Sequence, residues 1–511
     1  MSRPSAIRIA DGDTVAVALR VIAAGESVSV AGESLIARQE VPAGHKIALA
    51  SFEPEQVIRK YGVPIGVATT PIERGDWVHS HNLRTSLSGV LDYQYSPNGS
   101  MSKLEIGSDP NRNATRGVGM VPTFMGYKRA NGKVGTRNEL WVLNTVGCVN
   151  HAAERIAKQA AERYVGRVDG IHAFAHPYGC SQLGDDLKNT QAVLAGLLRH
   201  PNAGGVLILG LGCENNQLNE LMRLADDVDA SRIAFFNTQD VIDELEEGTG
   251  AVARLIERVS EDRRVECPVS DLVLGHKCGG SDGFSGITAN ALLGRIADRL
   301  TSLGGSVLLT EVPEMFGAEQ QLMNRATSDA VFGDIVHMVN DFKEYFLRHN
   351  QPVYENPSPG NKAGGLTTLE EKSQGAIQKG GRAPVSRVLR YGQPLSGSGL
   401  SLLESPGNDG VSSTAMVVSG ATLLLFTTGR GTPLGFPVPT LKISSNTDIA
   451  TRKPHWIDFN AGSLLDGTQT MAQLEDDLFA LVLAVASGEQ LANNEKNGYR
   501  EIAIWKEGVT L

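Results

Sequence analysis

Residues 141–148 read WVLNTVGC, a mainly apolar run that breaks into a turn of glycine and cysteine. The pattern returns in AFAHPYGC at 173–180, GVLILGLGC at 205–213 and DLVLGHKCGGSDG at 271–283. Apolar runs of this length, separated by helical segments, are typical of strands that are buried on both faces of a parallel sheet. We therefore predict βαβ units with right-handed crossovers, in which each cysteine lies at the carboxyl end of a strand.

The segments around these runs predict an α/β protein with several domains. The chain has 511 residues, which exceeds the usual size of a single core. Short apolar alternations in residues 1–93 are typical of a small β-rich module, and the Ser, Asn, Pro and Gly of residues 94–117 are typical of a linker. We expect an α/β domain at 118–355, with the cysteines, and a C-terminal α/β domain at 356–511. The sheets in both should be mainly parallel.

Composition and charge exclude several classes of protein. The formal net charge is −10 and no block of Lys and Arg interrupts the mixed charges, so we expect no nucleic-acid partner. No apolar stretch approaches the ~20 residues of a membrane span, and the N-terminus lacks the apolar core of a signal peptide. Five widely spaced cysteines do not resemble a disulfide framework. We expect a cytoplasmic protein with a small anionic substrate, and its oligomeric state stays open, a homo-oligomer included.

Cys148, Cys180, Cys213 and Cys278 are candidate metal ligands. Ligands bind at the carboxyl ends of the strands in open α/β sheets, so the four thiols are expected to line one crevice. Thiolates suit iron–sulfur clusters and soft ions. The alternative is that each thiol is inert packing in the core, a common role of free cysteine. Cys267 precedes its strand, and we expect it to be structural.

Acidic, amide and basic side chains follow other strands of the predicted sheets. Glu311 and Glu314 come directly after the run SVLL, where they would ligate a metal or exchange protons, or else cap the following helix. Arg430 lies in a glycine turn, suited to bind a carboxylate or to form a surface ion pair. Asn361 and Lys362 lie in a long loop at 354–368, which is either functional or a rigid prolyl linker.

Three histidines in the N-terminal module are candidates for proton transfer or metal binding. His79 and His81 are separated by one residue, and on a strand this spacing projects both imidazoles to one face. His45 lies nearby in the sequence PAGHK. The three imidazoles would serve as acid and base or hold a divalent ion. The spacing alone slightly favours solvated histidines at the edge of a strand.

Eight motifs spread over the chain indicate a known family: GYKRANGKVGTRNELWVLNTVGCVNHAAERIA, HPYGCSQLGDD, GLGCENNQ, CGGSDGFSGITANALLGR, LTEVPEMFGAEQ, YENPSPGNKAGG, FTTGRGTP and KEGVTL. They resemble the altronate dehydratase family, which also contains galactarate dehydratase and sulfolactate sulfo-lyase. The resemblance extends essentially from end to end, although residues 228–270 contribute little to it. The N-terminal module resembles the SAF domain of that family.

The resemblance implies hydro-lyase chemistry in hexuronate breakdown. In this reaction D-altronate loses water and gives 2-dehydro-3-deoxy-D-gluconate, with dependence on iron(II) (Fe2+) and manganese (Mn2+) as an optional support. The segments VHSHNLRTSL and HPYGCSQLGDD favour altronate over galactarate as the substrate. The alternatives are a lyase that acts on galactarate or a sulfonated hydroxy acid, and a non-catalytic protein that binds sugar acids.

The implied elimination assigns roles to the candidate residues. Removal of a proton next to a carboxylate needs positive charge, which a divalent metal supplies as a Lewis acid, together with a general base and a general acid. The expected catalytic residues are His45, His79, His81, Glu311 and Glu314. The expected substrate-binding residues are Asn215, Ser281, Asp282, Asn361, Lys362 and Arg430. The metal is either mononuclear iron(II) on His79, His81 and acidic side chains, or an iron–sulfur cluster on Cys148, Cys180, Cys213 and Cys278.

Overall fold

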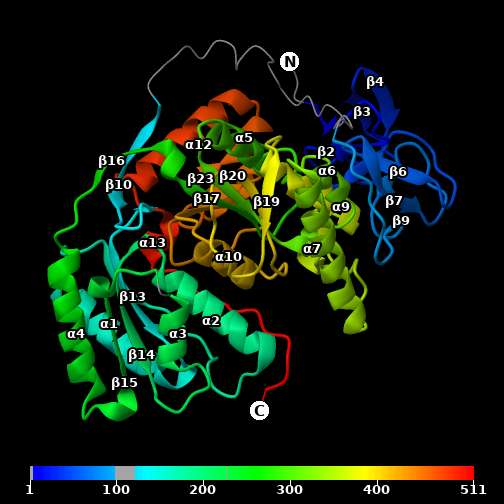
Figure 1. Cartoon of the computed structure of the whole chain (residues 1–511). Coiled ribbons are helices and arrows are strands. Elements are labelled where there is room, and N and C mark those ends of the chain that lie inside the picture. Colours follow the sequence, from blue (N-terminus) through cyan, green and yellow to red (C-terminus); the bar gives the residue numbers. More distant parts are fainter. Residues whose placement is uncertain (1–3, 98–120, 226, 511) are drawn as a thin grey trace.

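The computed structural model describes residues 4–97, 121–225 and 227–510. Figure 1 shows the N-terminal module in blue at one side of a larger body, next to α9. Most of the linker expected at 94–117 lies outside the described residues. None of the helices in the described ranges is both long and apolar enough to cross a membrane.

The N-terminal module consists of short antiparallel strands, as the apolar alternation predicts. In β3 (Ser27–Val30) and β6 (Val57–Lys60) every second side chain is buried. The strands form sheets with the orders β1-β2-β5-β8, β3-β4 and β6-β7-β9. The remaining strands are β1 (Ala6–Ile7), β2 (Val15–Ala18), β4 (Glu33–Ile36), β5 (Lys46–Ala48), β7 (Val63–Ala68), β8 (Trp77–Val78) and β9 (Leu83–Arg84).

The middle of the chain forms a four-stranded parallel sheet with the order β13-β12-β14-β15. Its central strands, β12 (Glu139–Asn144) and β14 (Ala203–Gly210), are buried almost throughout, as their apolar runs predict. The outer strands are β13 (Gly170–Ala173) and β15 (Ile233–Asn237). The helices that connect or follow these strands are α1 (Asn150–Arg163), α2 (Gly184–Leu198), α3 (Leu218–Leu224) and α4 (Glu244–Val259).

A second parallel sheet has seven strands in the order β19-β20-β18-β17-β21-β22-β23. The strands are β17 (Val273–Cys278), β18 (Ser306–Leu309), β19 (Val385–Leu389), β20 (Gly399–Leu403), β21 (Leu423–Thr428), β22 (Thr440–Ser444) and β23 (Phe459–Asn460). The expected domain boundary at 355/356 falls inside this sheet, because β17 and β18 precede it and pair with β21 and β20, which follow it.

Helices cover both faces of the seven-stranded sheet. They are α5 (Ala289–Ser302), α6 (Glu319–Met323), α7 (Asp329–Arg348), α8 (Pro359–Ala363), α9 (Leu369–Ala376), α10 (Asp409–Val418), α11 (Thr447–Arg452), α12 (Met471–Ala486) and α13 (Asn493–Asn497). A small antiparallel sheet of β10 (Thr123–Lys128), β11 (Val134–Gly135) and β16 (Val265–Pro268) lies beside α12. Cys267 lies on β16 itself, not before a strand, and it is fully buried, in keeping with a structural role.

The carboxyl edges of the two parallel sheets meet at one side of the body. Helices α2 and α10 start at the carboxyl ends of β13 and β20, and the two helices pack on each other. Residues 499–510, here called the C-terminal segment, link the middle of α10 to the beginning of α2. Ala503 N donates to Thr414 Oγ1 of α10 (3.0 Å), and Glu507 N donates to Asp186 Oδ1 of α2 (2.8 Å).

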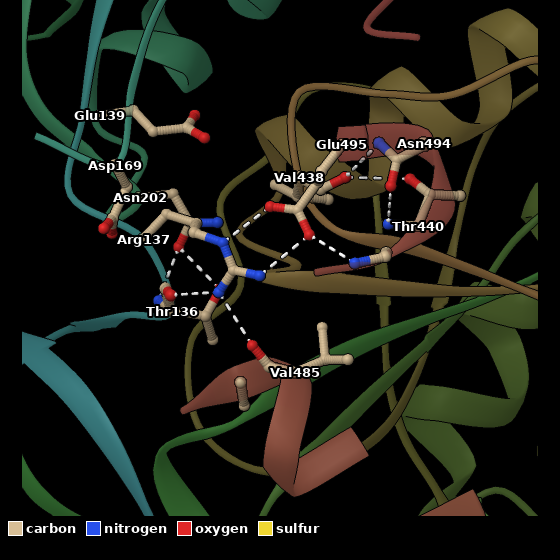
Figure 2. A network of polar contacts seen from close by, with 12 residues as sticks. Thr136, Arg137, Glu139, Asp169, Asn202, Val438, Thr440, Val485, Asn494 and Glu495 are labelled. Carbon is tan, nitrogen blue, oxygen red and sulfur yellow. Dashed lines mark hydrogen bonds and ion pairs between the residues drawn. The ribbon is translucent and has the colours of Figure 1, made fainter. Parts of the chain in front are cut away.

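A buried ion pair joins the two sheets where β12 begins. Figure 2 shows Arg137, which donates from Nε to Glu495 Oε1 (2.7 Å) and from Nη2 to Glu495 Oε2 (2.9 Å). Arg137 Nη1 also donates to the Val485 carbonyl oxygen at the end of α12 (2.8 Å). Both charged side chains are buried, and the two parallel hydrogen bonds fix their relative orientation.

Glu495→Gln is expected to destabilise the protein strongly. The variant leaves the guanidinium of Arg137 buried without its counter-charge, a change that costs about 3–5 kcal/mol of unfolding free energy. Urea unfolding of the wild type and the variant measures this cost. Glu261→Gln is the control, because it breaks an exposed ion pair with Arg258 (3.5 Å) and should cost less than about 1 kcal/mol. Equal losses of unfolding free energy in the two variants would mean that the buried pair does not stabilise the contact between the sheets.

Candidate active site

The turn that follows β17, residues 279–285, forms the base of the candidate site. Asp282 Oδ1 accepts hydrogen bonds from Ser285 Oγ and Ser445 Oγ (both 2.8 Å), and Oδ2 accepts one from Asn446 Nδ2 (2.9 Å). These bonds fix the turn against the loop after β22. Asp282 therefore shapes the turn through its carboxylate, and Ser281 lies buried beside it.

Two loops that carry cationic residues contact this turn. Arg430 N donates to the Gly280 carbonyl oxygen (3.0 Å), and Gly283 N donates to the carbonyl oxygen of Gly364 (2.8 Å), two residues after Lys362. Arg430 is exposed and Lys362 is half-buried. Neither side chain has a hydrogen-bond or ion-pair partner within the described part of the chain, so the surface ion pair considered for Arg430 is not formed there. Both charges are free to bind a carboxylate.

Asn361 holds the loop at 354–368 against the turn. Its Nδ2 donates to the Ser281 carbonyl oxygen (2.8 Å), and its Oδ1 accepts from Ser358 Oγ (2.9 Å) and Lys372 Nζ (3.1 Å). Ser358 is also the N-cap of α8, in a capping box with Asn361. The loop is therefore packed against the site and is not a free linker, while the amide of Asn361 is already engaged within the protein.

The three histidines gather around Trp77. The His79 ring stacks on the Trp77 indole with 5.3 Å between ring centroids, and the His81 and His45 rings lie 5.1 and 5.5 Å from it. The expectation that His79 and His81 share one face of a strand is wrong, because β8 ends at Val78. Asn82 closes a turn there by accepting a hydrogen bond from His79 N (2.9 Å).

The histidines differ in the freedom of their ring nitrogens. Trp77 Nε1 donates to His45 Nδ1 (3.2 Å), so the ring proton is on His45 Nε2, which lies 3.3 Å from the Ala363 carbonyl oxygen. Both nitrogens of His45 are thus engaged. In contrast, Nδ1 of His79 is buried and has no partner among the described residues. Burial, with the charge of Lys46, lowers the pKa of His79 to about 4, so its imidazole is neutral near neutral pH.

Cys278, Glu311 and Glu314 form a buried group beneath the turn. Cys278 Sγ lies 3.1 Å from Glu314 Oε2 and 3.9 Å from Glu311 Oε2. Glu311 has a φ of 71°, a left-handed conformation that non-glycine residues rarely adopt. Neither carboxylate caps the following helix, because α6 begins after Ala318. The capping role considered for these acids is therefore not what the structure shows.

Three buried lysines neutralise this group, and the sequence reading missed all of them. Their contacts are Lys277 Nζ with Glu311 Oε1 and Asp409 Oδ1 (2.7 Å for Asp409), Lys379 Nζ with Cys278 Sγ (2.7 Å) and Lys372 Nζ with Glu314 Oε1 (2.8 Å). Although burial opposes it, the charges of Lys372, Lys379 and Lys277 hold the pKa of Glu314 low, at about 2. Three ammonium groups thus face three carboxylates.

The lysines make the buried group a poor metal site. Burial, with the charge of Glu314, raises the pKa of the Cys278 thiol to about 12, so the thiol is neutral in this environment. A divalent ion would also lie among three ammonium groups that already satisfy the carboxylates. The three side chains are close enough to hold an ion, but their charge environment does not fit one.

Cys148, Cys180 and Cys213 lie on three neighbouring loops at the carboxyl edge of the four-stranded sheet. All three are exposed, whereas Cys278 is buried in the other sheet. The strand order β13-β12-β14 places the three loops next to one another. The structure therefore places three of the four expected thiols on adjoining loops, although not all within 4.8 Å of one another, and separates Cys278 from them. Exposure excludes the packing role that was the alternative for these three.

A glycine precedes each exposed cysteine and lets the loops pack closely. Gly147 N donates to the Tyr178 carbonyl oxygen (2.9 Å), and a side chain on Gly179 would overlap the Thr145 carbonyl oxygen. Asn215 braces the same loops, since its Oδ1 accepts from the backbone N of Ser181 (2.7 Å). Asn215 therefore lies with the exposed thiols rather than beside Asp282, with which the sequence grouped it.

Three family descriptions match consecutive parts of the chain. Residues 4–86 match the altronate/galactarate dehydratase SAF domain. Residues 126–260 match the second domain of D-galactarate dehydratase/altronate hydrolase, and residues 269–510 match the C-terminal part of D-galactarate/altronate dehydratase. The last two matches correspond to the four-stranded and seven-stranded sheets.

Curated proteins that resemble the chain match it over nearly its whole length. It is 48% identical over 509 residues to an altronate dehydratase of Bacillus subtilis, which covers 99% of this chain and 100% of the relative. It is also 48% identical over 511 residues to an altronate dehydratase of Escherichia coli, with 99% of each chain covered. A galactarate dehydratase (L-threo-forming) of Escherichia coli is 32% identical over 488 residues, which cover 91% of this chain and 90% of the relative.

Proposed function

The chain belongs to the altronate and galactarate dehydratase family, and from this premise we propose which of its residues carry out the dehydration. It is a hydro-lyase that removes water from D-altronate and gives 2-dehydro-3-deoxy-D-gluconate. We place the substrate where the N-terminal module meets turn 279–285. The observation that carries this placement is that Arg430 and Lys362, whose side chains have no hydrogen-bond or ion-pair partner among the described residues, belong to the two loops that contact the turn.

The free cations and the neutral imidazole suit the two halves of the elimination. Arg430 and Lys362 bind the substrate carboxylate and reduce its charge, so the enediolate that develops at C1 and C2 is stabilised. His79 accepts the C2 proton on Nδ1, a buried atom with no partner in the described part of the chain. His81 donates a proton to the C3 hydroxyl, which leaves as water while the C2–C3 double bond forms. The enol product then tautomerises to the 2-keto acid.

The remaining catalytic candidates, His45, Glu311 and Glu314, do not transfer protons in this proposal. His45 orients Trp77 and thereby His79, since both of its nitrogens are engaged. Glu311 and Glu314 pair with buried lysines beneath the turn, and their negative charges balance those of the lysines. We therefore assign proton transfer to His79 and His81 and not to these carboxylates.

The iron that the family implies fits the three exposed thiols. Cys148, Cys180 and Cys213 would hold an iron–sulfur cluster, because thiolate is the ligand that such clusters take. Such a cluster would supply Lewis-acid activation of a substrate oxygen. His79 and His81 have no third His, Cys, Asp or Glu near enough among the described residues to complete a mononuclear site. Three thiols also favour iron over manganese, which prefers oxygen ligands and imidazole.

Arg430→Ala is expected to lower kcat/KM for D-altronate by about 10–100-fold, through a higher KM. The estimate corresponds to one lost hydrogen bond to a charged group, about 1.5–3 kcal/mol. Steady-state formation of the 2-keto product measures the change. Arg452→Ala is the matched control, since Arg452 is exposed on α11 and, among the residues that the structure describes, pairs only with Asp448 of its own helix. The control should behave as the wild type.

The same assay separates the substrates of the family. Galactarate carries a second carboxylate and needs a second cationic contact, so we expect it to turn over more slowly than D-altronate. An Arg430→Ala variant with unchanged KM would contradict the placement of the substrate at turn 279–285. Faster turnover of galactarate or a sulfonated hydroxy acid by the wild type would contradict the assignment of D-altronate.

A further inference from the structure

A buried cluster of three charges joins the N-terminal module to the body. Glu371, on α9, accepts hydrogen bonds from Lys46 Nζ and Lys60 Nζ of the module, both at 2.8 Å. All three side chains are fully buried. Glu371 Oε2 also accepts from the backbone N of Thr367 (2.9 Å), which fixes the carboxylate from the body side. The module is thus docked on one carboxylate through two strands, β5 and β6.

The two lysines share this carboxylate but differ in what else they contact. Lys46 also donates to the Gly365 carbonyl oxygen (2.8 Å), in the loop that contains Lys362. Lys60 Nζ bonds only Glu371 among the described residues and lies 5.0 Å from the centroid of the Tyr61 ring. Lys46 is therefore the one lysine of the pair that connects Glu371 with the loop beside the substrate turn.

Lys46 is also connected to the histidines. It directly follows His45, whose Nε2 lies 3.3 Å from the carbonyl oxygen of Ala363 in the same loop. Strand β5 pairs with β8, with Lys46 opposite Val78, and His79 is the next residue of the chain. A displacement of Lys46 would consequently move His45 and the turn that carries His79 together.

The body side of this contact is a single helical turn. Glu370 of α9 accepts hydrogen bonds from Ser86 N and Thr85 Oγ1 of the module (both 2.8 Å). Lys372, on the same turn, pairs with Glu314 of the buried group (2.8 Å). Three consecutive residues of α9 therefore contact both the module and Glu314 of the buried group beneath turn 279–285. This fixes the distance between the module and that group.

We propose that Lys46 is a positioning residue for the dehydration. It fixes the position of His45, Trp77 and His79 relative to loop 361–365 and turn 279–285. The proposal rests on the proposed function, in which His79 accepts the C2 proton. Lys60 also docks the module on Glu371 but does not fix the position of these side chains. Small misplacements of a reacting group reduce turnover steeply, by about 10²-fold for 1 Å.

The experiment compares Lys46→Met with Lys60→Met in the full-length protein. Each variant removes one ammonium from the same carboxylate and leaves the other, so both should lower the melting temperature by a similar amount. We expect Lys46→Met to lower kcat for D-altronate by about 10²-fold with little change in KM, because the substrate-binding cations remain. Lys60→Met should retain kcat within about threefold. If the methionine variants do not fold, Lys46→Gln and Lys60→Gln replace them.

The outcomes separate this proposal from the proposed function. Equal kcat values for the Lys46 and Lys60 variants, in a wild type that turns over D-altronate, would overturn the positioning role alone. A rise in KM with unchanged kcat for Lys46→Met would overturn it as well, since the lysine would then act on substrate binding. A wild type that does not dehydrate D-altronate would overturn both proposals.

Discussion

Cys213→Ser is expected to abolish D-altronate turnover and to remove iron and acid-labile sulfide from anaerobically purified protein. Cys213 is exposed on one of three adjoining loops, and a serine hydroxyl does not replace thiolate as a ligand for an iron–sulfur cluster. A cluster on three thiols would lose one of its attachments. Iron and sulfide analysis on the same sample as the turnover assay measures both effects.

Cys278→Ser is the control for this prediction. Cys278 lies among buried lysines in the other sheet, so its replacement should leave iron and sulfide in place even where it lowers stability. Turnover and iron near wild type in Cys213→Ser would show that the exposed thiol is not a ligand. Iron without sulfide in active wild-type protein would move the metal to histidine and carboxylate ligands.

His79→Ala is expected to lower turnover by roughly 10²–10⁴-fold while iron content and fold stay intact. The imidazole lies in a turn that follows β8, so its removal loses the stacking on Trp77 but leaves the strands of the module in place. Because burial lowers the pKa of His79 to about 4, the neutral base is present above that pH and is lost as pH falls through it. The wild-type kcat/KM should therefore decline on the acid side near pH 4 and not near 6.5.

His151→Ala is the matched control, because His151 is exposed on α1 and its one polar partner in the described ranges is Glu154 of the same helix. It should retain full turnover. A His79→Ala variant with unchanged turnover would remove this residue from the mechanism. An acid limb near pH 6.5 would contradict the assignment of His79 as the base.

The parallel sheets could be predicted because each central strand is an apolar run that is recognisable from the local sequence alone. The runs before Cys148 and Cys213 are apolar on both faces, and each is followed by a glycine that permits a tight turn. Strand order then determines which loops adjoin, so three exposed thiols meet at one edge. Sequence position alone did not reveal that Cys278 belongs to a different sheet, since all four turns look alike.

The charged network could not be predicted, because its members are far apart in the chain. Lys379 lies 101 residues from Cys278, and no local spacing marks the two as neighbours. The histidines were misplaced for a local reason. The alternation in VHSHN suggested a strand, but Asn82 prefers to close a turn, and its hydrogen bond to His79 N ends β8 at Val78.

The docking of the N-terminal module on Glu371 sets an order of events during synthesis. Glu371 lies 325 residues after Lys46 and 311 after Lys60, so the module leaves the ribosome long before its partner exists. Until then the two ammonium groups of its docking face, which also carries the Tyr61 ring, are exposed to water. The lysines lose their hydration only when the body has been made and the carboxylate of Glu371 replaces the water.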